Sequence, residues 1–218
     1  MSSKKHRDPA LLAKELAVGP PRPEPLLVLG IDPGTSCGVC YAYHDPSRPL
    51  ELKAKHFYMG QWDLSAGPFD SGSIRFARLR QFLAVLRPDF VCYEQVRFSP
   101  DKTMMAGSMQ AIMARAATSI EFMGAIKGTL CTWCEENGVP CTGFAIGEIK
   151  KRATGKGVAD KKLMIQATNS FFGVDLDPEN FANNGDDNVA DAVWTCVLGL
   201  EQYGAGILPA GTYPVPAS

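Results

Sequence analysis

The sequence predicts an α/β fold in which a mixed five-stranded sheet, with three antiparallel strands followed by parallel ones, carries helices on both faces. Three strand-like segments come first, and the connections between them are short enough for an antiparallel meander. The later strand-like segments alternate with stretches of helical periodicity, the pattern that produces parallel strands covered by helices. The chain has 218 residues, 45% of them apolar, which suits one globular domain of ordinary size.

The first half of the domain is expected to supply four strands and one helix. Leu26–Asp32 is an apolar run typical of a buried strand, and Gly38–Tyr43 is interpreted as its neighbour. Leu50–Tyr58 alternates polar and apolar residues, which predicts a third strand. Ile74–Leu86 has apolar residues at helical spacing and ends before a proline, and Phe90–Gln95 is the fourth strand.

The second half is expected to supply the last strand and the remaining helices. The predicted elements are the helices Met104–Ala117 and Ile120–Glu136, the strand Pro140–Ile146, and the helices Ala159–Phe172 and Asp187–Tyr203. We therefore expect a basic, proline-rich arm over residues 1–25, one domain over 26–204 and an irregular tail over 205–218.

Composition restricts the functional classes. No uninterrupted apolar run is long enough to span a bilayer, and no apolar signal segment follows the basic N-terminus, so we expect a cytoplasmic protein without a membrane partner. The seven cysteines include two CxxC spacings, Cys37–Cys40 and Cys131–Cys134. Because neither pair lies in the loop of a zinc knuckle, we interpret them as buried or inert thiols.

Three acidic residues occupy similar positions in the predicted elements. Asp32 ends the first strand, Glu94 lies near the end of the fourth, and Asp191 lies in the closing helix. Carboxylates brought together from separate elements are what Mg²⁺ needs, and two such ions can activate a water and stabilise the leaving oxygen at a phosphodiester. Asp187, four residues before Asp191, shares its helix face and is a candidate fourth ligand.

Each of these acids also has a simpler interpretation. Asp32 before Pro-Gly is a common turn opener, and Glu94 is compatible with an edge-strand charge. Asp186 and Asp187 suit the N-terminal end of a helix, where negative charge is favourable.

A basic segment lies between the fifth strand and the next helix. Its cationic members are Lys150, Lys151, Arg152, Lys156, Lys161 and Lys162. The glycines Gly155 and Gly157 among them allow close approach of the backbone to phosphates, so we expect nucleic-acid binding here despite a net charge of −1. The alternative is a solvated charged face.

The set of motifs resembles the RuvC-type Holliday junction resolvases, nucleases of the RNase H-like superfamily. The residues that carry the resemblance are Gly30-Ile31-Asp32-Pro33-Gly34, Tyr93-Glu94-Gln95-Val96, Ala153-Thr154-Gly155-Lys156-Gly157-Val158-Ala159-Asp160-Lys161 and Ala190-Asp191-Ala192. They follow one another in the family's order between about Leu26 and Leu200, which is most of the chain.

The resemblance implies a crossover junction endodeoxyribonuclease of DNA recombination and repair, acting in the cytoplasm or in the DNA-containing compartment of its host cell or organelle. Such an enzyme would act as a homodimer, bind four-way DNA junctions and nick two strands, using Mg²⁺ or Mn²⁺, with two ions in each active site. It implies metal ligation by Asp32, Glu94 and Asp191. It also implies that Lys156 and either Lys161 or Lys162 lie near the scissile phosphate, and Lys161 is our candidate for a catalytic role. The nucleic-acid contacts it implies are made by Arg97, Phe98, Lys150, Lys151, Arg152, Thr154, Lys156 and Lys162.

The chain departs from the family pattern at two positions of the site. Three residues before the final aspartate, where the family has Asp or His, this chain has Asn188, so either Asn188 or Asp187 fills the fourth ligand position, and we favour Asp187. The aromatic residue that contacts the opened junction falls on Phe98, after Arg97. Phe98 suits base stacking or simple core packing.

Two further features concern assembly and loops. The predicted helix Met104–Ala117 contains four methionines, more than a solvated face would hold, and is our candidate for the dimer contact; a core role is the alternative. The loop from Gln61 to Gly72 looks like an addition to the family pattern.

Three other functions share some of these residues. A related RNase H-like nuclease acting on flaps, forks or RNA–DNA hybrids would use the same acids, and a non-catalytic junction-binding protein would keep the same fold. Gly30–Thr35 also resembles the first phosphate loop of actin-like and sugar-kinase ATP-binding proteins. Those proteins need paired domains, for which a chain of this length has no room.

Overall fold

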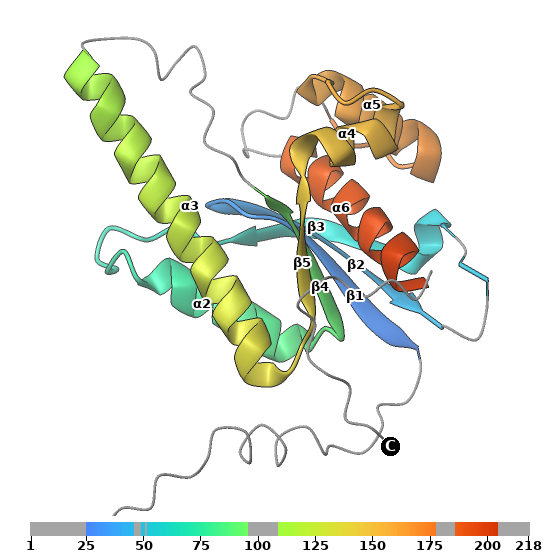
Figure 1. Cartoon of the computed structure of the whole chain (residues 1–218), viewed down its shortest axis with the longest axis horizontal. Coiled ribbons are helices and arrows are strands. Elements are labelled where there is room, and N and C mark those ends of the chain that lie inside the picture. Colours follow the sequence, from blue (N-terminus) through green and yellow to red (C-terminus); the bar gives the residue numbers. More distant parts are fainter. Residues whose placement is uncertain (1–24, 46–48, 51, 96–108, 178–185, 205–218) are drawn as a thin grey trace, which may run out of the picture.

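The protein is described by a computed structural model that covers residues 25–45, 49–50, 52–95, 109–177 and 186–204. Its centre is one five-stranded sheet of order β3-β2-β1-β4-β5 (Figure 1). The strands are β1 (Leu26–Asp32), β2 (Ser36–His44), β3 (Phe57–Asp63), β4 (Phe90–Gln95) and β5 (Cys141–Ala145). β1 pairs with β2, and β2 with β3, in antiparallel fashion, whereas β4 is parallel to both β1 and β5, which confirms the predicted mixed sheet.

Helices cover both faces of this sheet, as predicted (Figure 1). They are α2 (Ile74–Leu86), α3 (Met109–Asn137), α4 (Ile146–Thr154), α5 (Lys161–Phe172) and α6 (Asp186–Gly204). One apolar core lies between the sheet and α2 with α3, and a second lies between the sheet and the group α4, α5 and α6. Among the described residues, no helix combines the length and apolar character that crossing a lipid bilayer requires.

Two predicted elements are placed differently in the structure. The third strand runs from Phe57 to Asp63 and not from Leu50 to Tyr58, and a short 3-10 turn, Ala54–His56, precedes it. The alternation at 50–58 was misleading because Leu50 and Leu52 pack against the apolar core without belonging to a strand. The predicted additional loop accordingly begins after Asp63.

The two helices predicted over 104–117 and 120–136 are one continuous helix, α3, within the described residues. The sequence between them, Thr118-Ser119, contains neither proline nor glycine, so nothing ends the helix there. Residues 104–108 lie outside the described residues. The start of the basic segment is helical as well, since it lies in α4, which follows β5 directly. Gly155, whose φ of 76° is left-handed, caps the C-terminal end of this helix.

Candidate metal centre

The sheet register brings the first two acids together. β1 and β4 are parallel neighbours with Ile31 beside Tyr93, so the next residues, Asp32 and Glu94, lie side by side where both strands end. Side chains alternate between the faces of a strand. Asp32 therefore shares the face of Gly30, which packs against α6.

Glycine at two sheet positions lets α6 approach this face closely. A Cβ on Gly30 would lie 2.6 Å from the Ala192 carbonyl oxygen and 2.7 Å from the Cys196 Cα, both in α6. A Cβ on Gly38, the cross-strand partner of Asp32, would collide with the backbone carbonyl of Asn188. The absence of side chains at these two positions allows α6 to place Asp191 against the sheet.

Asp32, Glu94 and Asp191 each offer a carboxylate oxygen, and these oxygens lie within 4.8 Å of one another. Glu94 is buried, with 8% of its surface exposed. The Oδ1 atom of Asp191 is buried and has no hydrogen-bond partner among the described residues. An acceptor oxygen in this state is costly unless a cation or a donor reaches it.

The acids destabilise one another's charged forms. Burial raises the pKa of Asp32 well above its ordinary value, and the nearby charges of Glu94 and Asp191 raise it further. Burial and the charge of Asp191 raise the pKa of Glu94 to about 7. The pKa of Asp191 rises to about 6, mainly through burial. Ionised together, these groups require a positive charge between them.

The donor set fits a hard divalent cation. Three carboxylates without a thiol or an imidazole are typical ligands of Mg²⁺ or Mn²⁺, whereas zinc sites use cysteine and histidine. Within the described part of the chain, which includes all seven cysteines, no other group of at least three such side chains is close enough to hold an ion.

The cysteines instead contribute to the two apolar cores. Cys37 and Cys40 belong to the cores on opposite faces of β2, so they do not converge on one ion. Cys134 is buried beside the half-buried Cys131, whose thiol contacts the Tyr93 hydroxyl at 3.7 Å. All seven cysteines are outside disulfides, and five of them are buried, as the sequence predicted, whereas Cys131 and Cys141 are half-buried.

Asp187 and Asn188 have different surroundings. Asp187 forms an ion pair with Lys161 and lies close enough to raise the pKa of both Asp32 and Asp191. It does not belong to the group of three oxygens. The side-chain amide of Asn188 donates a hydrogen bond of 2.9 Å to the Ser36 carbonyl oxygen, which ties α6 to the start of β2.

Two lysines lie beside the acids. Lys150 is half-buried, its Nζ donates a 2.7 Å hydrogen bond to the Ala159 carbonyl oxygen, and its charge lowers the pKa of both Glu94 and Asp191. The charge of Lys161 acts in the same direction on Asp32 and Asp191. The sequence suggested a position near the reaction for Lys161, but for Lys150 only DNA contact. Lys150 could have been recognised from its position, because its helix, α4, directly follows β5, and β5 pairs with β4 beside Glu94.

The other predicted DNA-contacting residues have mixed environments. Lys151, Lys156 and Lys162 are exposed. Thr154 donates to the Lys150 carbonyl oxygen at 2.9 Å and so closes the end of α4. Arg152 is held in an ion pair with Glu201, at 2.6 Å. Arg97 and Phe98 lie outside the described residues.

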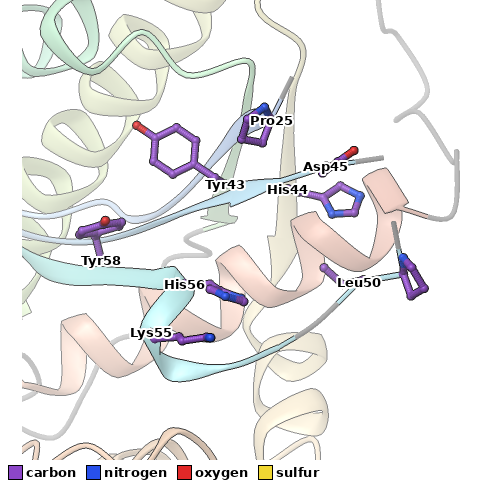
Figure 2. A pocket seen from close by; sticks show the side chains of 9 residues that line it. Pro25, Tyr43, His44, Asp45, Leu50, Lys55, His56 and Tyr58 are labelled. Carbon is purple, nitrogen blue, oxygen red and sulfur yellow. The ribbon is translucent and has the colours of Figure 1, made fainter. Parts of the chain in front are cut away.

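A pocket of about 500 Å³ lies at the end of the sheet opposite to the three acids (Figure 2). Its walls include Tyr43, His44 and Tyr58 from β2 and β3. His44 pairs with Leu26, at the start of β1, whereas the acids lie where β1 ends. The pocket contains none of the predicted site residues.

Solved structures share this architecture. The structure of T. thermophilus RuvC in complex with a Holliday junction substrate has a TM-score of 0.58 and 20% sequence identity, over 84% of this chain and 98% of that chain. A second structure of Thermus thermophilus RuvC gives a TM-score of 0.56 over the same shares, also at 20% identity. The sheet order and the helices on its two faces are those of the RNase H-like fold.

Sequence comparison is more specific. No family model matches this chain. The crossover junction endodeoxyribonuclease RuvC of Salinispora arenicola (strain CNS-205) is 31% identical over 142 residues, which are 63% of this chain and 69% of that protein. The chain belongs to the RuvC family.

Proposed function

We propose that this protein is a divalent-metal-dependent endonuclease that resolves four-way DNA junctions by hydrolysing phosphodiester bonds. The observation that carries the proposal is the convergence of three carboxylates, within 4.8 Å, in a chain of the RuvC family. The Salinispora relative is a crossover junction endodeoxyribonuclease, and the Thermus relative was solved with a Holliday junction substrate.

Asp32, Glu94 and Asp191 would hold the metal, and the unpartnered Oδ1 of Asp191 supports ligation from the α6 side. Bound Mg²⁺ or Mn²⁺ would activate a water and stabilise the leaving oxygen, in the manner of two-metal nucleases. We assign Asp187 as the fourth acid because it is a carboxylate that lies close enough to Asp32 and Asp191 to raise the pKa of both.

The protein groups orient the phosphate. Lys150 and Lys161 bring positive charge to the acids from α4 and from the start of α5. In the hydrolysis, the water oxygen bonds to phosphorus, the bond to the leaving oxygen breaks, and that oxygen takes up a proton. Lys161, which is exposed and paired with Asp187, is our candidate for the cation that contacts the scissile phosphate.

DNA would lie over the exposed part of the basic segment. Three exposed lysines suit contacts to phosphates: Lys151, Lys156 and Lys162. The loop that contains Gly155 and Gly157 offers backbone groups close to these lysines. Arg97 and Phe98 would contact the DNA where the junction is opened.

We further propose a homodimer, since resolution needs two symmetric nicks. α3 extends well beyond the sheet (Figure 1) and exposes Met113 and Ile120, at 66% and 52% of their surfaces. Sedimentation of the full chain, with Met113→Glu and Ile120→Glu as interface variants, tests this assembly.

The experiment that tests the function offers the full chain a panel of labelled four-way junctions, forks, flaps, duplexes and RNA–DNA hybrids with Mg²⁺ or Mn²⁺. We expect paired nicks in the four-way junction that EDTA abolishes. Cleavage confined to flaps, forks or hybrids would show that the substrate is one of these and not a four-way junction. The absence of cleavage of every DNA in the panel would contradict the proposed nuclease activity.

A further inference from the structure

Arg152 in α4 forms a bidentate ion pair with Glu201 near the end of α6. Its Nε lies 3.0 Å from both carboxylate oxygens of Glu201, and its Nη2 lies 2.6 Å from Oε1. Both side chains are about two-thirds covered, with 31% and 35% of their surfaces exposed. A planar, two-pronged pair of this kind fixes orientation better than a single surface contact.

Two aromatic rings lie near the same guanidinium. Its Cζ lies 5.4 Å from the ring centre of Trp194 in α6 and 6.0 Å from that of Phe171 in α5. The Trp194 indole in turn donates a 2.9 Å hydrogen bond to Thr168 of α5. Arg152 therefore connects all three helices of one layer, which lie together on one side of the sheet (Figure 1).

The helices that Arg152 connects, α4 and α6, also carry Lys150 and Asp191 of the acidic centre. Lys150 lies two residues before Arg152 in α4, and Asp191 lies ten residues before Glu201 in α6. Residues two apart in a helix point in widely different directions, so one can anchor the helix while the other faces the acids. The Lys150 ammonium is half-buried and is held by the Ala159 carbonyl oxygen at 2.7 Å.

We infer that Arg152 is a positioning residue: by locking α4 onto α6 it holds the Lys150 ammonium beside Glu94 and Asp191, and it does not itself contact DNA. This inference rests on the proposed nuclease function. Arg152, which the sequence predicted to contact DNA, is therefore reassigned, because its guanidinium pairs with Glu201 and lies near two aromatic rings.

A first experiment reads the position of Lys150 without any activity. In the full chain, amine labelling followed by mass spectrometry should show Lys150 reacting more slowly than the exposed Lys151. Arg152→Gln or Glu201→Gln should raise Lys150 labelling toward the rate of Lys151. The control is Arg80→Gln, which breaks another interhelical pair, Arg80–Glu136 at 2.6 Å, away from the site. Unchanged Lys150 labelling in both site variants overturns the inference.

A second experiment uses nicking of a four-way junction. We expect Arg152→Gln to lower kcat about tenfold with KM changed less than about twofold. In a Lys150→Met background the same substitution should have almost no further effect on kcat, and the charge swap Arg152→Glu with Glu201→Arg should restore part of the rate. A rise in KM, or an undiminished loss in the Lys150→Met background, would show direct DNA contact or general destabilisation.

The two experiments separate the two proposals. If the wild-type chain nicks no junction, the proposed function fails, while the labelling result still decides whether Arg152 holds Lys150. If the wild type nicks junctions and the Arg152 and Arg80 variants behave alike, only the present inference fails.

Discussion

Gly38 of β2 lies directly against the backbone of Asn188 in α6, so closely that a Cβ at this position would overlap the Asn188 carbonyl. The Asn188 side-chain amide donates a 2.9 Å hydrogen bond to the carbonyl oxygen of Ser36, which precedes Gly38 by two residues. Since Asn188 precedes Asp191 by less than one helical turn, this contact sets how far the Asp191 carboxylate lies from Asp32.

Gly38→Ala should therefore weaken metal binding as well as the fold. The added methyl must push α6 away from the sheet, and forcing extra volume into a packed site costs about 1–3 kcal/mol of unfolding free energy. We expect Mn²⁺ affinity, measured by calorimetry, to fall together with stability in urea. The matched control is Gly60→Ala in β3, where a Cβ meets nothing within 4 Å. Equal effects of both substitutions would contradict this role for Gly38.

Removing one carboxylate should stabilise the protein when divalent cations are absent. Burial and the acidic neighbours oppose the charged form of Asp32, so at neutral pH the folded state must either carry this charge at a cost or take up a proton, and Asp32→Asn removes that cost. In EDTA we expect a higher melting temperature than wild type, by about 2–4 °C for each kcal/mol gained. In Mg²⁺ the wild type should gain stability and the variant much less. A variant that melts lower in EDTA would contradict the proposed repulsion.

The metal-free protein should lose stability as the pH rises from about 4.5 to 7. The folded state keeps the proton on Asp191 up to about pH 6 and the proton on Glu94 up to about pH 7, the raised pKa values of these groups, while the unfolded chain has already released both. Each such proton contributes a slope of about 1.4 kcal/mol per pH unit.

The measurement is the unfolding free energy of wild type and Glu94→Gln in EDTA across this range. Their difference isolates the contribution of Glu94, and it should grow in favour of the variant as the pH rises. Saturating Mg²⁺ should flatten the difference, because the cation favours the ionised carboxylate. A difference independent of pH would show that Glu94 ionises normally.

The exposed lysines of the basic segment should control the salt dependence of DNA binding. Each phosphate contact adds about 0.9 to the slope of log K against log salt concentration. Lys156→Ala and Lys162→Ala should each reduce that slope by about one and weaken junction and duplex binding alike. Lys55→Ala, on the pocket at the other end of the sheet, is the control and should leave the slope unchanged.

The topology and the acidic centre could be predicted because both follow from short-range patterns. Apolar runs and helical periodicity located β1, β4 and α2, and parallel neighbours that end together bring Asp32 beside Glu94. The third strand was predicted too early, because alternation at Leu50 and Leu52 is also produced by a segment that packs its leucines without pairing.

The separate roles of Lys150 and Arg152 could not be read from a cluster of positive charges. They depend on the rotation of α4 about its axis and on partners far along the chain, Ala159 and Glu201. The close approach of α6 at Gly30 and Gly38 is likewise a tertiary contact, which the sequence marks only by the missing side chains.

The most direct test of the central claim compares junction nicking and junction binding by wild type, Asp32→Asn, Glu94→Gln and Asp191→Asn. If the three carboxylates jointly hold the catalytic cations, each substitution should abolish nicking in Mg²⁺ while binding to the four-way junction persists or tightens. Substantial nicking by any one of the three variants would contradict the shared metal centre.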